Sequence, residues 1–167
     1  MNKQRIAILS LFLFLVLFTT TGCGQKETLM DVPAKDGNYY YNNKDLGFSI
    51  ILPAVFQYYQ VQRVEKPDYI DIEYFVPTSD TGYFQPVPGY AMPLIVRMIK
   101  MPSWQKMEAN QGSSTISDLV ISGDTIAAKS DNYVYVLKFW NNYPKDWQQK
   151  WDDGMKQSII GGFKKIK

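Results

Sequence analysis

The sequence predicts an α+β domain in which a curved antiparallel sheet is covered by helices. Short apolar or alternating runs, separated by turns rich in Gly, Pro, Asn and Asp, recur between positions 39 and 140. Such runs are typical of antiparallel strands. Apolar residues then recur every four positions from Trp147 to Phe163, which is typical of an amphipathic helix. We therefore expect residues 39–167 to form one domain, a length that suits a single core.

The N-terminal segment has the parts of a secretory signal peptide. A basic start precedes residues 6–18, an almost wholly apolar run, and small residues follow it. As a helix this run would reach only about 20 Å, which is too short for a hydrocarbon core of about 30 Å. We therefore expect residues 1–22 to be a removable signal peptide and not a membrane span.

Cys23, directly after Gly22, is the only cysteine of the chain. This junction resembles the lipobox of bacterial lipoproteins, in which the cysteine sulfur receives a diacylglycerol and cleavage makes the cysteine the new N-terminus. Thr20 stands where that family prefers Leu, Val or Ile. The resemblance implies lipid attachment at Cys23 and an extracytoplasmic, membrane-anchored location. Residues 23–38 mix charges with Pro and Gly and are predicted to be a flexible tether.

The composition excludes several classes of site. The chain has no His and one Cys, so a disulfide, a His/Cys zinc site and a Ser-His-Asp triad cannot form within it. Two of the 18 basic residues lie in the signal peptide, which leaves 16 basic and 16 acidic residues. Without a basic field we expect no nucleic-acid partner. We also expect no metal and no cofactor. An aromatic content of 15% supplies material for an apolar core.

The strands are predicted from local patterns. Tyr39–Tyr41 and Gly47–Pro53 flank an Asn/Asp-rich turn and form a hairpin, which Pro53 ends by removing a ladder donor. Tyr69–Val76 alternates cleanly and is expected to be a half-buried strand. Tyr133–Trp140 is apolar on both faces except at Lys138 and is expected to be central. Further strands are predicted, the first of them weakly, at 57–65, 94–99, 115–121 and 125–129.

Two helices are predicted. Ser103 would cap a short helix over 104–111, which ends at Gly112. The second begins at Pro144, and its stripe of large apolar residues is expected to face the core and not a cofactor. The Gly161-Gly162 pair should end this helix, leaving Phe163 in a short tail that lies back on the sheet. The stripe comprises Trp147, Trp151, Met155, Ile159 and Phe163.

The order of elements resembles that of the PsbP-like domains of small bacterial lipoproteins. Leu46–Pro53 is similar to their opening "GFSI-LP" hairpin, and Tyr133–Val136 to their "YVYV" strand. Ile159–Lys164 is similar to the end of their last helix, except that Gly161-Gly162 departs from the usual Asn-Ser or Lys-Ser. The resemblance implies an α/β/α sandwich. It also implies an accessory, assembly or binding role, because the family has no shared catalytic residues.

The Pro77–Pro93 segment is the main candidate for recognition. It is long and rich in Pro and Gly, so we expect a loop without regular structure. Tyr83, Phe84 and Tyr90 argue against plain disorder. On a loop stiffened by proline, these rings could stack on sugars or anchor a partner protein. The alternative is that they fold back over the sheet as a lid on the core.

Two weaker patterns suggest chemistry. Ser103–Lys106 spells the S-x-x-K of penicillin-binding proteins, and Ser130–Asn132 spells their S-D-N, but no K-T-G follows. A helix cap explains Ser103 equally well. Asp71 and Glu73, with Asp68 nearby, would stand about 7 Å apart on one strand face and could share a hard cation. The alternative is a solvated face that resists edge pairing.

We therefore expect a lipid-anchored extracytoplasmic accessory or binding protein at the bacterial cell envelope, and not an enzyme. Its partners would be the membrane, through the anchor, and a protein or glycan of the envelope. The candidate binding residues are Tyr83, Phe84 and Tyr90. The alternative is a small cell-envelope hydrolase that uses Ser103 and Lys106 or a carboxylate pair.

Overall fold

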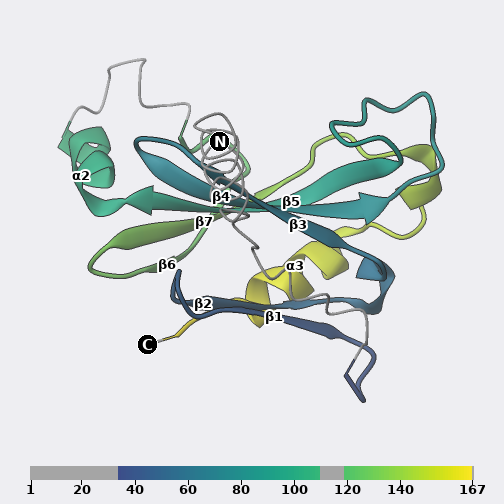
Figure 1. The fold of residues 1–167 in the computed structure, drawn as a ribbon, viewed down its shortest axis with the longest axis horizontal. Helices are drawn as coiled ribbons and strands as arrows, with labels where there is room; N and C mark the ends of the chain where they lie inside the picture. The colour runs from purple at the N-terminus through teal and green to yellow at the C-terminus, as the bar shows by residue number, and fades with distance from the viewer. Residues whose placement is uncertain (1–33, 110–118, 167) are drawn as a thin grey trace, which may run out of the picture.

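The computed structural model describes residues 34–109 and 119–166 and contains two antiparallel sheets (Figure 1). The small sheet has the order β1-β2-β8, with β1 at Tyr39–Asn43, β2 at Phe48–Leu52 and β8 at Lys164–Lys165. The large sheet has the order β3-β4-β5-β7-β6. Its strands are β3 (Gln60–Glu65), β4 (Tyr69–Pro77), β5 (Tyr90–Lys100), β6 (Thr125–Lys129) and β7 (Tyr133–Phe139).

The described helices are α2 (Met101–Ala109) and α3 (Asp153–Gly162), with short 3-10 turns η2 (Ala54–Phe56) and η3 (Lys145–Trp147). The α+β class agrees with the prediction. The expectation of one sheet covered by helices is wrong in part, because the small sheet shares one face of the large sheet with α3 (Figure 1). No helix in the described residues is long and apolar enough to cross a membrane.

The predicted signal peptide, Cys23 and most of the predicted tether lie outside the described residues. The last five tether residues, 34–38, form a hydrogen-bonded turn, in which the Gly37 N–H donates to the Ala34 carbonyl at 2.8 Å. Tyr40 also donates its hydroxyl to Asp36 at 2.6 Å. These local bonds order the last residues of the predicted tether next to β1.

The predicted hairpin is confirmed. Tyr39 pairs with Leu52 and Asn43 with Phe48, and Pro53 follows the last paired residue. Gly47 adopts a φ of 71° in the turn, a left-handed conformation that glycine reaches without steric cost. The inward residues of β2 are fully buried, as the alternation predicted: Phe48, Ile50 and Leu52.

The predicted Pro77–Pro93 loop is too long at both ends. Pro77 still belongs to β4, and β5 begins at Tyr90, so Pro93 lies inside a strand. At this point Met92 and Pro93 of β5 face only Phe75 of β4, because the register shifts there. A β-bulge of this kind leaves a residue outside the regular ladder, which tolerates a proline that has no N–H to donate.

Three other strand predictions have mixed outcomes. The strand over 125–129 is confirmed as β6. The predicted strand over 115–121 lies partly outside the described residues, and its last three residues, 119–121, are not in a strand. β7 is an interior strand as expected, but the middle of the large sheet is β5.

Both helix predictions need correction at their starts. α2 begins at Met101, so Ser103 lies within its first turn and is not its cap. The helix predicted from Pro144 is interrupted: η3 ends at Trp147 and α3 begins only at Asp153. Asp152 causes the new start, since its side chain accepts the N–H of Met155 at 2.7 Å as a helix N-cap.

The apolar stripe nevertheless faces the core. Trp147, Ile159 and Phe163 are buried, and Trp151 and Met155 pack against the same cluster while partly exposed. Phe163 lies just after α3, as predicted, and stacks on Phe48 with ring centroids 5.7 Å apart. The core therefore joins the small sheet, α3 and one face of the large sheet.

Candidate functional site

The β4–β5 connection, residues 78–89, lies at the end of the large sheet opposite α2 (Figure 1). We call it the 78–89 loop. Its two ends are joined by a hydrogen bond from the Thr78 N–H to the Gly89 carbonyl at 2.9 Å. Gln85 holds the interior, since its amide donates to the Asp80 carbonyl at 2.9 Å and accepts the Gly89 N–H at 2.7 Å. The loop is therefore fixed by its own polar groups.

Two carboxylates bind this loop to η3. The Asp80 carboxylate accepts the Gly82 N–H at 3.0 Å and the Lys145 N–H at 2.9 Å. The Asp146 carboxylate accepts the Thr78 hydroxyl at 2.7 Å and the Ser79 N–H at 3.0 Å. The Gly82 bond lies within the loop, whereas the other three bonds cross 65 or more positions of sequence and position the loop on the rest of the domain.

Hydrogen bonding also sets the charge of Asp146. Partial burial acts to raise its pKa, but the bonds from the Ser79 N–H and the Thr78 hydroxyl outweigh burial and lower the pKa below the ordinary value of 3.8. Asp146 is therefore ionised at neutral pH and remains a strong hydrogen-bond acceptor.

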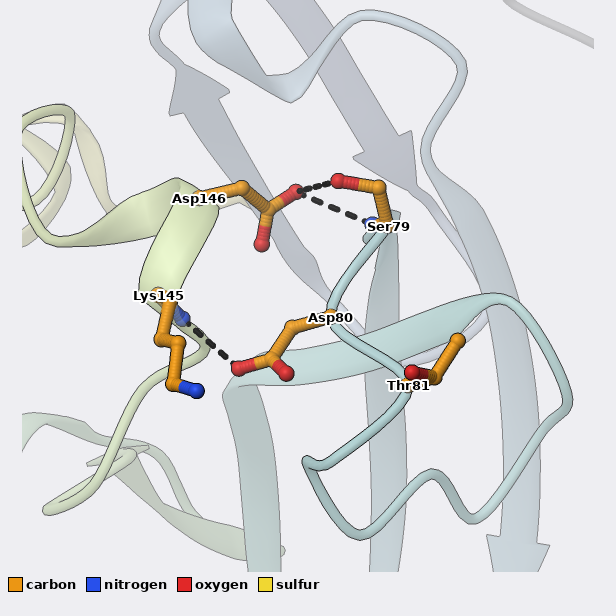
Figure 2. Close-up of a pocket in the computed structure, with 5 residues that line it drawn as sticks. All are labelled: Ser79, Asp80, Thr81, Lys145 and Asp146. Carbon is orange, nitrogen blue, oxygen red and sulfur yellow. Dashed lines mark hydrogen bonds between the residues drawn. The ribbon is translucent and has the colours of Figure 1, made fainter.

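These residues line an open pocket of about 270 Å³ (Figure 2). The Asp80 carboxylate lies between Lys145 and Thr81 in this view. The lining carries two carboxylates, two hydroxyls and the Lys145 side chain: Ser79, Asp80, Thr81, Lys145 and Asp146.

The structure does not place the three predicted aromatic residues in equivalent positions. Tyr83 is partly buried and donates its hydroxyl to the Asn142 carbonyl at 3.1 Å, and burial raises its pKa. Tyr90 lies in β5, where its hydroxyl accepts a bond from Gln60 at 2.9 Å. Phe84 is 83% exposed. Tyr83 and Tyr90 therefore help to hold the structure, whereas Phe84 does not cover the core as a lid.

The predicted carboxylate cluster is divided among separate contacts. Asp71 is buried and forms two bonds of 2.8 Å with the Arg97 guanidinium, so the expected solvated face is wrong at this residue. Asp68 accepts the Ser103 hydroxyl at 2.8 Å. Burial raises the pKa of Glu73, with a smaller contribution from Asp71. Over residues 34–109 and 119–166, no three acidic residues gather as metal ligands.

The S-x-x-K and S-D-N patterns are not joined by the described contacts. The Ser103 hydroxyl is directed to Asp68, and the Ser130 hydroxyl bonds the carbonyl of Tyr133 at 3.1 Å in the β6–β7 turn. Lys106 is exposed on α2. These contacts give Ser103 and Ser130 structural roles in a helix turn and a hairpin turn.

Sequence reasoning missed Asp80, Lys145 and Asp146. The run Thr-Ser-Asp-Thr-Gly from Thr78 to Gly82 does signal an Asx turn at Asp80. Nothing local signals that η3 approaches this turn, because the two segments are distant in sequence. No protein-family model, no curated protein and no solved structure matches the chain.

Proposed function

We propose that the protein is a lipid-anchored extracytoplasmic binding protein of the bacterial cell envelope, whose 78–89 loop presents Phe84 to a partner. The observation that supports this role most is the 83% exposure of Phe84 on a loop held by hydrogen bonds. Anchoring at Cys23 would keep that loop at the membrane surface.

The order of the 78–89 loop favours a binding role for Phe84. Isolated exposed apolar residues are common on protein surfaces and need no explanation. Phe84 differs because its loop is held on both sides, by Gln85 and by the bond from Tyr83 to Asn142. A loop that is already ordered loses little conformational entropy on binding, so an aromatic anchor on it retains more of its binding free energy.

We also propose a PsbP-like arrangement for the domain. Its supports are the opening β1–β2 hairpin and the Tyr133–Val136 segment within β7, followed by α3. The small β1-β2-β8 sheet differs from the single sheet covered by helices that the resemblance implies.

The anchor has a direct test. Cys23→Ser removes the only sulfur that could accept a diacylglycerol, so labelling with a radioactive fatty acid should fall to background. Anchoring by a diacylglycerol is firm because it inserts two chains, and the variant should therefore leave the membrane fraction or remain unprocessed. Equal labelling of wild type and variant would refute the lipoprotein assignment.

The loop has a separate test. Phe84→Ala should change the free energy of unfolding by less than about 0.5 kcal/mol, because the ring is exposed. It should weaken binding to lipid-extracted envelope fragments at least about tenfold, measured by co-sedimentation of the detergent-solubilised protein. Ile126→Ala is the control, since it removes another exposed apolar side chain, on β6. Full-strength binding by the Phe84 variant would remove the role proposed for the loop.

A further inference from the structure

We propose that the pocket of Figure 2 and Phe84 together bind a neutral glycan, with Asp80 and Thr81 contacting sugar hydroxyls and Phe84 contacting a ring face. This inference rests on the proposed function and names the ligand class of the same loop. Three observations support it: the pocket has free hydrogen-bond acceptors, its lining carries both charges, and the exposed Phe84 ring lies three residues after Thr81.

The acceptor capacity is provided mainly by Asp80. A carboxylate has about four lone-pair sites. The N–H groups of Gly82 and Lys145 each bind one oxygen of Asp80, which leaves about half of these sites available. The same two bonds fix the direction of the carboxylate. A ligand that matches it must bring O–H or N–H donors.

The charges of the lining favour a neutral ligand. Asp80 and Asp146 would repel an anion such as a phosphate, and Lys145 is the single basic residue of the lining. A calcium ion requires six to eight oxygen ligands, and two carboxylates already bound to N–H groups do not provide them. Sugar hydroxyls both donate and accept hydrogen bonds. They can therefore donate to the carboxylates and accept from the Thr81 hydroxyl and the Lys145 ammonium at the same time.

The exposed ring provides the apolar part of the site. A pyranose ring has a face of C–H groups, and the large flat ring of Phe84 can cover such a face without needing a polar partner. The pocket is slightly smaller than the range of about 300–1,000 Å³ typical for drug-sized ligands. It therefore suits one or two sugar units of a longer chain.

The polar lining of the pocket favours a glycan over a protein partner. The core of a protein interface is usually an apolar patch. The loop around Phe84 is mixed, since Tyr83 and the Pro-Val-Pro run at 86–88 are apolar, but the pocket itself is lined by carboxylate, hydroxyl and ammonium groups. A polar pocket on the same loop as an exposed aromatic ring matches the polar edges and apolar faces of a sugar chain.

The test uses the full-length lipidated protein in a phosphocholine detergent, because maltoside and glucoside detergents would compete. Neutral tetrasaccharides of glucose, mannose and N-acetylglucosamine are the probes, and saturation-transfer NMR and calorimetry measure binding. We expect at least one probe to bind, with a Kd that changes less than twofold between 50 and 500 mM salt. A neutral ligand has no ionic attraction for salt to screen.

Variants assign the contacts. Thr81→Val should weaken probe binding at least fivefold and Phe84→Ala at least tenfold. Phe84→Tyr should bind as wild type does because it keeps an aromatic ring, whereas Phe84→Leu should not. Ile126→Ala is the unchanged control, and melting temperatures within 2 °C of wild type would show that the variants are folded.

Two outcomes would overturn the glycan inference: no binding of any probe, or binding that Thr81→Val and Phe84→Ala leave unchanged. If no probe binds while Phe84→Leu still binds envelope fragments and Phe84→Ala does not, the apolar bulk of the side chain at position 84 anchors a protein. In that case the proposed function stands and the glycan inference fails. If Phe84→Ala binds the fragments at full strength, the proposed function itself fails.

Discussion

The two faces of the large sheet bury their residues by different physical means. The face toward the small sheet and α3 is lined by aliphatic and aromatic side chains from β4, β5 and β7. Phe48 of β2 packs there against Tyr41, Tyr135 and Phe163, with ring centroids between 5.7 and 6.2 Å apart. This face is stabilised mainly by removing apolar area from water.

The opposite face combines apolar and charged residues. α2 packs there through Trp104, which contacts a small buried cluster with Ile99, Val134 and Val136. Beside this cluster the Arg97 guanidinium pairs with Asp71 and lies 3.9 Å from the centre of the Tyr69 ring.

Lys138 and Asp124 form a second, mostly buried ion pair on that face. The comparison shows that one sheet can exclude charged groups on one face and accept them on the other. The two most buried charges on that face, Asp71 and Asp124, each have a cationic partner, because an unpaired buried charge is very costly.

The largest expected effect is on the apolar face. Phe48→Ala removes a fully buried ring and should lower the free energy of unfolding by about 4 kcal/mol, measured by urea denaturation. The same substitution at the exposed Phe84 is the matched control and should cost less than about 0.5 kcal/mol. Similar losses at the two sites would contradict the assigned burial.

A somewhat smaller effect is expected on the charged face. Arg97→Ala leaves the buried Asp71 carboxylate unpaired and should cost about 3 kcal/mol. The double variant Asp71→Leu with Arg97→Met should unfold within about 1 kcal/mol of wild type, because it removes both charges and keeps the volume. A double variant less stable than Arg97→Ala would show that the ion pair itself stabilises this face.

The smallest effects distinguish two buried tyrosines of the apolar face. The Tyr135 hydroxyl donates to the Leu46 carbonyl at 2.9 Å, so Tyr135→Phe should cost about 1 kcal/mol. The Tyr74 hydroxyl is buried with no hydrogen-bond partner in the structure, and burial raises its pKa well above 10. Tyr74→Phe should therefore be neutral or slightly stabilising in thermal melts. A clear loss at Tyr74 would indicate a bound water that this hydroxyl holds.

Local sequence patterns determined several elements correctly. The β1–β2 hairpin and the strands β4 and β6 all follow from side-chain periodicity and turn residues within about ten positions. The expected half-burial of β4 is wrong, because Asp71 and Phe75 on its second face are buried as well. The burial of Trp147 and Ile159 was also predicted correctly, although the single helix on which that prediction rested was not. The helix behind that prediction is interrupted between η3 and α3, and Trp147 is buried because it packs against Phe56 and Trp140.

Pairing between distant segments decided the rest. Asp71 has the pattern of a solvated residue, and only the register of β4 against β5 places Arg97 directly opposite it. Likewise, the pocket exists because the fold brings η3 to the turn at Asp80, and the exposure of Phe84 depends on where that loop is held. Periodicity identifies which side chains share a face, whereas burial of that face depends on which element packs against it. The burial of a face therefore depends on contacts between distant segments, which only the tertiary structure provides.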